Sequence, residues 1–182
     1  MGMAATIPYY TVDDLAHFPD DGNRYELLDG VLLVTPAPGT RHELIVSRLN
    51  GILIPAVQTP GHAFVFAAGA ISFPPRTQLE PDLLVVPSCT PLADRWQDLS
   101  EHWLAVEVFS RSSRIYDREF KRDAYLNLGV KEVWLVDGAD RTVEVSYVVG
   151  KTATIRHAIT WRPPTLEFDV RVDLSVLFAG LD

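Results

Sequence analysis

Two short, unbroken apolar runs constrain the fold of this chain more than any other feature of its sequence. One is DLLVVP, which begins at Asp82, and the other is HWLAVEVF, which surrounds Glu107. Apolar runs of this length, without alternating polar residues, are typical of strands that are buried on both faces. We therefore expect two central strands of a sheet that is flanked by helices, in an α/β fold.

The N-terminal third of the chain predicts a short helix, a β-hairpin and a longer helix. Thr11, with Asp14 three residues later, forms a capping box for the short helix. RYELL and VLLVT flank Asp29-Gly30, a pair that favours a tight hairpin turn because both positions tolerate positive φ. Thr40 and Glu43 form a second capping box, which begins a helix with apolar residues at helical spacing.

The C-terminal half predicts a helical crossover followed by further strands. A helix over about residues 114–128 ends before Gly129 and connects the run around Glu107 with the strand KEVWLVD. Such a connection favours parallel strands, so the sheet should be mixed. TVEVSYVV and TATIRHAIT predict a hairpin about Gly150-Lys151, and VDLSVLF adds a last helical turn.

Length and composition predict one globular domain spanning residues 1–182. Apolar residues make up 47% of the chain and charged residues 22%, as in ordinary globular proteins. Cys89 stands alone, so no intramolecular disulfide can form, and a reducing cytoplasm fits best. Neither a secretory signal nor an apolar stretch of roughly 20 residues is present. We expect a soluble, cytoplasmic protein without a membrane partner.

The formal net charge of −8 limits how the chain could bind nucleic acid. Nucleic-acid binders more often carry a positive surface that releases counterions from phosphate. Any contact with nucleic acid must therefore be local. Carboxylates gathered around a metal ion would account for part of the negative charge, and a bound divalent cation would reverse the local field.

Asp82 and Glu107 are the first candidates for a chemical site. An ionised carboxylate in an apolar core is costly unless it is paired or binds a metal, and neighbouring strands would bring both side chains to one end of the sheet. Such oxygen ligands suit Mg²⁺, which is commonly held by one or two carboxylates together with water and substrate phosphate oxygens. The alternatives are that Asp82 caps a strand end and that Glu107 forms a structural ion pair.

Lys121 lies on the helix that follows the second apolar run. Asp117, Lys121 and Tyr125 are spaced four residues apart and share one face of that helix. If this face looks into the site, the lysine could stabilise charge on a phosphate or help to position and deprotonate a water. Asp117 and Lys121 also have the orientation of an ordinary exposed ion pair, so spacing leaves both interpretations open. Tyr125 and Trp134 favour core positions over stacking platforms.

Five blocks of the sequence resemble the Uma2 family, in the order typical of that family. They are YELLDG at 25–30, PDL at 81–83, VEVFS at 106–110, the series Asp117, Lys121 and Tyr125, and GVKEVWLVD at 129–137. No single block is specific, but together they span most of the chain. The family, formerly DUF820, is placed in the PD-(D/E)XK nuclease superfamily. The resemblance therefore implies a restriction-endonuclease-like fold, with a central mixed sheet flanked by helices and additional antiparallel hairpins.

The resemblance also implies roles for individual residues. It assigns Asp82 and Glu107 as ligands of Mg²⁺, for which Mn²⁺ could substitute. The superfamily pattern places a lysine two residues after the acid, where this chain has Phe109. Uma2-like sequences are thought to carry that lysine on the next helix, which makes Lys121 the third catalytic candidate.

Four accessory candidates surround this trio. Glu26 and His42 match positions typical of the family and border the same cleft, Glu26 as an additional carboxylate and His42 as a polar contact. Asp117 and Tyr125 join them from the helix face of the lysine. On the alternative interpretation, Glu26 is an outward-facing strand residue and His42 is a solvated histidine of the first helical turn.

Three functions fit these observations. The leading one is a Mg²⁺-dependent endonuclease that hydrolyses phosphodiester bonds, with DNA as the expected partner. A homodimer is compatible with it, because related nucleases often address both strands. The second is a catalytically silent binding or regulatory protein, which the acidic balance and the lack of a recognisable DNA-reading module favour. The third is a metal-assisted hydrolase that acts on a smaller phosphorylated substrate.

Overall fold

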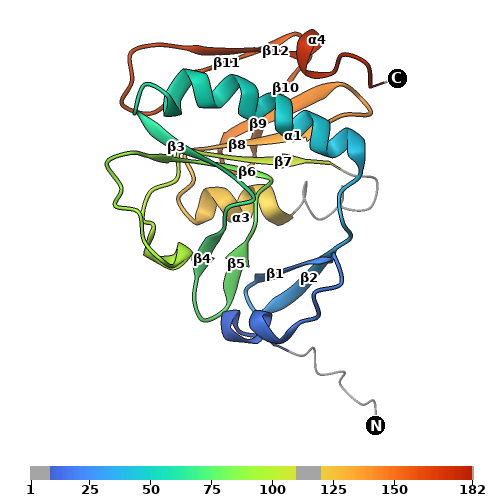
Figure 1. Cartoon of the computed structure of the whole chain (residues 1–182), viewed down its shortest axis with the longest axis vertical. Helices are drawn as coiled ribbons and strands as arrows, with labels where there is room; N and C mark the ends of the chain where they lie inside the picture. The colour runs from blue at the N-terminus through green and yellow to red at the C-terminus, as the bar shows by residue number, and fades with distance from the viewer. Residues whose placement is uncertain (1–8, 110–119, 182) are drawn as a thin grey trace.

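A six-stranded sheet forms the centre of the computed structural model, which describes residues 9–109 and 120–181 (Figure 1). In spatial order its strands are β10 (Lys151–Ile155), β9 (Thr142–Val148), β8 (Glu132–Asp137), β7 (Leu104–Val108), β6 (Leu83–Pro87) and β3 (Ala63–Ala67). β7 and β8 run parallel, whereas the other neighbouring pairs of this sheet run antiparallel. The sheet is therefore mixed, as predicted, and the two apolar runs are its central strands β6 and β7.

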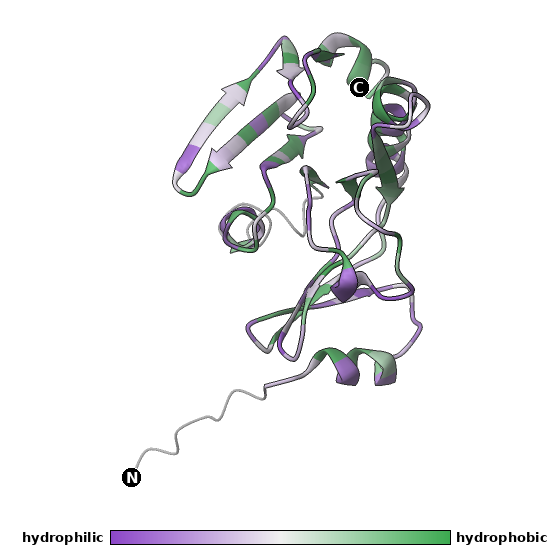
Figure 2. Ribbon diagram, turned by 90° about the vertical axis from the view of Figure 1, so that its left-hand side faces the viewer, coloured by the Kyte–Doolittle hydropathy of each residue, from purple (hydrophilic) through white to green (hydrophobic). Residues whose placement is uncertain are grey.

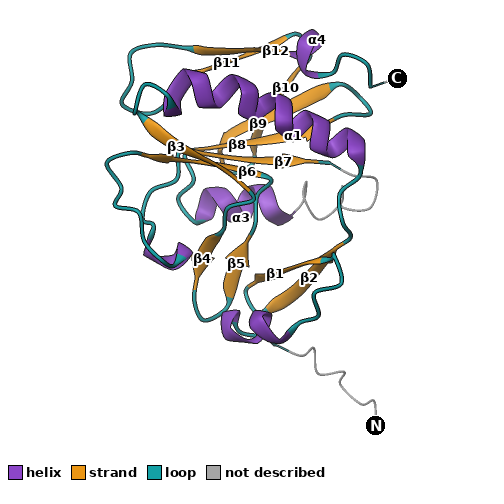
Figure 3. Ribbon diagram, in the orientation of Figure 1, coloured by secondary structure: helices purple, strands orange, loops and turns teal. Residues whose placement is uncertain are grey.

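Every residue of β6 and β7 is buried, and alternate side chains enter two separate cores. One face is covered by helix α1 (Thr40–Leu53) with its π-helical extension (Ile54–Gln58), and the other by helix α3 (Arg122–Asn127). The odd-numbered side chains of β6 pack on the α1 side and the even-numbered ones on the α3 side. Figure 3 shows the two helices on opposite sides of the sheet. Burial on both faces explains why these runs lack alternation.

A four-stranded antiparallel sheet forms a separate layer beneath the first (Figure 2). Its order is β2 (Val31–Thr35), β1 (Arg24–Leu28), β5 (Thr77–Leu79) and β4 (Ile71–Phe73), and a 3-10 helix (Val12–His17) packs against β1. The predicted hairpin at Asp29-Gly30 is confirmed, since both residues have positive φ, at 52° and 83°. A side chain at Gly30 would also collide with the ring of Tyr9.

The C-terminal segment forms a third layer on the outer side of α1. Its elements are β11 (Ala158–Trp161), β12 (Val170–Asp173) and α4 (Leu174–Leu177). Arg48 of α1 donates to the carbonyl oxygens of Leu177 and Ala179, at 2.9 and 2.7 Å. The prediction of one strand through residues 152–160 is wrong, because the chain bends at 156–157 and β11 buries its apolar side chains in the α1 core instead.

The predicted starts and ends of the helices agree with the structure only in part. Gly39 is the N-cap of α1, so the predicted capping box of Thr40 and Glu43 is wrong, and the Glu43 amide donates to the Gly39 carbonyl instead. The capping box of the first short helix is confirmed. The crossover helix ends before Gly129 as predicted, but its predicted start lies outside the described residues. Among the described helices, none is long and apolar enough to cross a membrane. One domain over 1–182 and a cytoplasmic location stay predictions.

Candidate functional site

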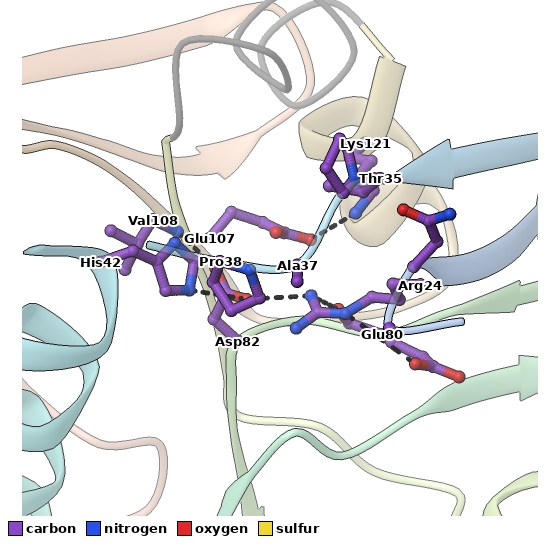
Figure 4. A pocket seen from close by; sticks show the side chains of 13 residues that line it. Arg24, Thr35, Ala37, Pro38, His42, Glu80, Asp82, Glu107, Val108 and Lys121 are labelled. Atoms are coloured by element: carbon purple, nitrogen blue, oxygen red, sulfur yellow. Dashed lines mark hydrogen bonds and ion pairs between the residues drawn. The ribbon is translucent and has the colours of Figure 1, made fainter. Parts of the chain in front are cut away.

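A cavity of about 310 Å³ lies where the two larger sheets and the first turns of α1 and α3 come together (Figure 4). Its lining residues are Gly22, Asn23, Arg24, Thr35, Pro36, Ala37, Pro38, His42, Glu80, Asp82, Glu107, Val108 and Lys121. The cavity thus contains all three residues of the predicted catalytic trio, and its walls come from segments far apart in the sequence.

The antiparallel pairing of β6 and β7 brings Asp82 and Glu107 to this cavity. Asp82 directly precedes β6, Glu107 is the penultimate residue of β7, and Leu83 pairs with Val106. Both acidic residues are buried, with exposed fractions of 4% and 2%. The prediction that neighbouring strands bring them to one end of the sheet is confirmed.

The carboxylate of Asp82 contacts the side chains of Arg24 and His42 and the backbone amide of Val108. Its Oδ1 lies 2.9 Å from Arg24 Nη1 and 3.3 Å from His42 Nε2, and its Oδ2 accepts from the Val108 amide at 2.7 Å. Burial alone would raise the pKa of Asp82, but these three neighbours outweigh burial and lower it. The bond from the Val108 amide also caps the end of β7. The alternative role of Asp82 as a strand cap therefore applies to its Oδ2, while its Oδ1 contacts Arg24 and His42.

Lys121 directly precedes α3 and lies between two carboxylates. Its Nζ is 2.7 Å from Glu26 Oε2, an ion pair outside hydrogen-bond geometry, and donates to Glu107 Oε1 at 3.1 Å. Lys121 is only 2% exposed, so its interpretation as half of a surface ion pair is wrong. Its expected partner Asp117 lies outside the described residues.

Tyr125, one helical turn after Lys121, combines a core position with a polar contact. Its ring is fully buried among apolar residues on the α3 side, as predicted, and Trp134 is buried in the core on the α1 side. The Tyr125 hydroxyl donates to Glu107 Oε1 at 2.5 Å. Burial, reinforced by the charges of Glu107 and Glu26, raises the Tyr125 pKa well above its usual value. The hydroxyl therefore stays protonated as a donor to Glu107.

Glu26 and His42 also belong to the site. Glu26 is fully buried, and its Oε1 accepts from the Glu80 amide at 2.7 Å, so its interpretation as an outward-facing strand residue is wrong. The His42 side chain is 11% exposed and turns its Nε2 toward Asp82, which excludes a solvated histidine. The first turn of α1 thus contributes a polar side chain to the cavity lining, whereas Glu26 of β1 lies behind that lining and reaches the site through its ion pair with Lys121.

Arg24 and Glu80 are site residues that the sequence-based predictions missed. Arg24 is two residues before Glu26, and Glu80 is two residues before Asp82, so in extended chain each pair lies on one side of the backbone. Burial lowers the Arg24 pKa, but the charges of Asp82 and other nearby carboxylates outweigh it and raise that pKa overall. Burial, then the charge of Glu26, raise the Glu80 pKa. The two-residue spacing was the available signal for both.

The carboxylates of this cavity fit a divalent cation that is held partly by water. Asp82 and Glu107 border one cavity, and Mg²⁺ is commonly bound through one or two carboxylates with water completing its shell. Within residues 9–109 and 120–181, no group of three or more His, Cys, Asp or Glu side chains is arranged so that it could hold a metal ion. Because Arg24 and Lys121 contact these carboxylates, an incoming cation would compete with both side chains.

Comparisons with known proteins agree with this fold. Among solved structures, the chain is similar to a putative nuclease belonging to DUF820 from Anabaena variabilis ATCC 29413, with a TM-score of 0.75. The two share 19% sequence identity, and the match covers 93% of this chain and 97% of that one, so the likeness shows the fold. No curated protein matches the chain.

The family comparison covers most of the sequence. The Uma2 family model, described as "Putative restriction endonuclease", matches residues 12–176. This range contains the hairpin of β1 and β2, the central strands β6 and β7, and every side chain placed in the cavity. As its five sequence blocks predicted, the chain belongs to the Uma2 family of restriction-endonuclease-like proteins.

Proposed function

We propose that this cavity is the active site of a Mg²⁺-dependent nuclease that hydrolyses phosphodiester bonds, with DNA as its substrate. The observation that carries the proposal is the buried ammonium group of Lys121, which lies between Glu26 and Glu107 in a cavity that Asp82 also borders. Buried charges lower stability unless they are well compensated, and their concentration in one cavity is typical of functional sites. Membership of the Uma2 family supports the same function.

Each side chain has a role in this proposal. Asp82 and Glu107 would hold the ion, and bound Mg²⁺ would supply an acidified, oriented water and a counter-charge for the phosphate. In the hydrolysis itself, a water would add to phosphorus and release a proton to solvent, while the bond to the leaving oxygen would break and that oxygen would take up a proton. Lys121 donates to a phosphoryl oxygen as negative charge develops. Glu26 fixes the position of the ammonium group, and Tyr125 fixes that of Glu107.

Arg24 supplies the second positive charge of the proposed site. Its guanidinium group lines the cavity beside Asp82 and keeps its charge there. A guanidinium group binds two oxygens of a phosphate in parallel, which a lysine cannot do. When Asp82 binds the cation instead, Arg24 becomes available to hold the phosphate. Arg24 and Lys121 suit a negatively charged diester, and Asp82 and Glu107 suit a divalent ion.

Cleavage assays with three variants test this function. Supercoiled plasmid, linear DNA and RNA are incubated with the protein and Mg²⁺ or Mn²⁺, and cleavage is followed on gels. We expect Asp82→Asn and Glu107→Gln to abolish cleavage and Lys121→Met to reduce its rate by about 100- to 1,000-fold, as for loss of other transition-state donors. Glu132→Gln, a carboxylate outside the cavity that accepts from Trp134, serves as the matched control and should cut normally.

Two results would contradict the proposal. One is a parent protein that cuts no polymer with either metal, and the other is cleavage at the parental rate by Asp82→Asn or Lys121→Met. Thermal melting of each variant separates loss of activity from loss of folding. Nucleotides and other small phosphorylated compounds are included in the assay, because cleavage of these alone would identify a hydrolase of small substrates.

A catalytically silent binding protein is the second candidate. Arg24 already contacts Asp82, and Lys121 lies between Glu26 and Glu107, so each of these carboxylates has a cationic partner without a metal. If the protein is a catalytically silent binding protein, calorimetric titration with Mg²⁺ should give no heat of binding. Binding that disappears in Asp82→Asn would favour the nuclease instead.

A further inference from the structure

A second cavity, of about 440 Å³, lies in the C-terminal layer and is lined by basic side chains from separate segments. Arg141 belongs to the turn between β8 and β9, Arg156 and His157 to the bend between β10 and β11, and Arg171 to β12. The three arginines are exposed to solvent. Residues from three places in the sequence thus present positive charge to one open cavity.

The charge of this cavity differs in sign from that of the whole chain. The chain carries a formal net charge of −8, yet among the described residues that line the cavity Asp173 is the only carboxylate. Its Oδ1 accepts from the amide and hydroxyl of Ser175, at 2.9 and 2.6 Å. The cavity therefore has a net positive charge. Arginine forks in such a setting bind phosphate oxygens bidentately.

The turn that carries Arg141 is held in shape by its own hydrogen bonds. Asp137 Oδ1 accepts from the amides of Ala139 and Asp140, at 3.0 and 2.9 Å. The left-handed backbone of Arg141, with φ of 53°, then turns the chain into β9. On the other side, Arg48 fixes the carbonyl oxygens of Leu177 and Ala179, and Ala179 lines the cavity. The walls of the hollow are therefore built into the fold.

Helix α1 connects this cavity with the candidate active site. His42, in its first turn, contacts Asp82, while Arg48 holds the segment that lines the basic cavity. Six helical residues correspond to about 9 Å along the helix axis. A polymer whose scissile phosphate lies in the first cavity could therefore extend past this helix toward the second.

We infer that the basic cavity is a binding site for the phosphodiester backbone of nucleic acid, in which Arg141, Arg156 and Arg171 contact phosphates that flank the cleaved one. This inference rests on the proposed nuclease function of the first cavity. It also resolves the problem posed by the acidic chain, because it identifies where a local positive surface could bind a polyanion. Contacts of this kind give affinity without sequence preference.

Binding of a fluorescein-labelled 20-base-pair DNA duplex in EDTA, measured by anisotropy, tests the inference without cleavage. We expect Arg156→Gln/Arg171→Gln to bind about tenfold more weakly than the parent near 0.1 M salt. Its slope of log affinity against log salt concentration should be shallower by about 2, one for each lost phosphate contact. Arg95→Gln/Lys131→Gln removes two exposed charges outside both cavities and should behave like the parent.

Parental affinity and salt slope in the Arg156→Gln/Arg171→Gln variant would overturn the inference, as would an equal loss in the control or a parent that does not bind the duplex. Hydrolysis of bis(4-nitrophenyl) phosphate, a diester with a single phosphate and no flanking ones, should be unchanged in this variant. The two proposals can therefore fail separately. Arginine-dependent binding without any cleavage would refute the nuclease and leave the binding site standing. Cleavage with arginine-independent binding would do the reverse.

Discussion

Both faces of the six-stranded sheet bury an apolar core, but the two faces differ in the charged groups that they bury. On the α1 side, the strands present an unbroken apolar core that includes Leu49 and Trp134. On the α3 side, an apolar core of similar construction is interrupted at one end by Glu107, Lys121 and the Tyr125 hydroxyl. One face therefore serves packing alone, while the other combines packing with a cluster of buried charges.

This difference separates the sources of stability from the sources of function. Apolar side chains on the α1 face contribute through burial and close packing, so their loss creates cavities. The charged groups on the α3 face depend on their partners, and removing one leaves another buried and uncompensated. Substitutions on the two faces should therefore have different signatures. Substitutions on the α1 face should lower stability alone, and substitutions in the charged cluster of the α3 face should lower both stability and the rate of cleavage.

The largest expected effect on stability is that of Trp134→Ala on the α1 face. Trp134 is fully buried and packs edge-on against Trp161, with ring centroids 6.0 Å apart. Truncation should lower the free energy of unfolding by about 3–5 kcal/mol, measured by urea denaturation. Activity per folded molecule should not change. Val176→Ala, at an exposed position, is the control and should remain within about 0.5 kcal/mol of the parent. A loss below 1 kcal/mol for Trp134→Ala would contradict this account of the face.

Lys121→Met breaks the charged cluster of the α3 face. It leaves Glu26 and Glu107 without the ammonium group between them, and we expect a loss of about 3 kcal/mol in the same assay. The triple variant Glu26→Gln/Glu107→Gln/Lys121→Met keeps the volume and removes the charges, so it should regain most of that stability without regaining cleavage. A Lys121→Met protein as stable as the parent would show that the ion pairs are not coupled in this way.

The contrast between the faces also explains what the sequence could predict. The runs around Asp82 and Glu107 identified the central strands because burial on both faces leaves a continuous apolar pattern. The Asp29-Gly30 turn followed from local backbone preference. Helical spacing placed Lys121 and Tyr125 on one face, but spacing does not say which face is buried. The burial of Lys121 depends on Glu26, which lies in the other sheet.

Residues missed in the sequence illustrate the same limit. Arg24 and Glu80 reach the site because strand β1 and the segment before β6 meet at the junction of two sheets. Two-residue spacing shows that Arg24 accompanies Glu26, but only the tertiary arrangement places Arg24 beside Asp82 and Glu26 beside Lys121. The C-terminal strands β11 and β12 were likewise obscured, because their pairing joins segments on either side of a long loop.

His102 lies just before β7, at the opposite end of that strand from Glu107, and allows a further test of how buried polar groups affect stability. It is 2% exposed, and its Nε2 has no hydrogen-bond partner in the described structure, unlike the paired acids of the site. Burial lowers the His102 pKa to about 4 from 6.5, although the charge of Glu101 opposes the shift. The unfolded chain therefore binds this proton more readily. The stabilising effect is complete above pH 6.5 and is lost as the pH falls from 6.5 to 4.

This loss should amount to about 2–3 kcal/mol across that pH range. His102→Leu should flatten the dependence of unfolding free energy on pH between 6.5 and 4, when urea denaturation is repeated at several pH values. His17→Leu removes an exposed histidine and should keep the parental dependence. If the parent and His102→Leu lose stability in parallel over this range, the unpartnered histidine is not the cause.

The smallest expected effect belongs to Tyr125→Phe, which keeps the ring in the core and removes only the donor to Glu107. A hydrogen bond to a charged group contributes about 1.5–3 kcal/mol, and the remaining bond from Lys121 should hold the loss near the lower value. Because Tyr125 positions Glu107, cleavage should slow as well, with the larger change in kcat than in KM. Tyr147→Phe, at an exposed position, should change neither quantity. Parental stability with unchanged kcat in Tyr125→Phe would mean that this hydroxyl belongs to the packing of the α3 face and not to its charged cluster.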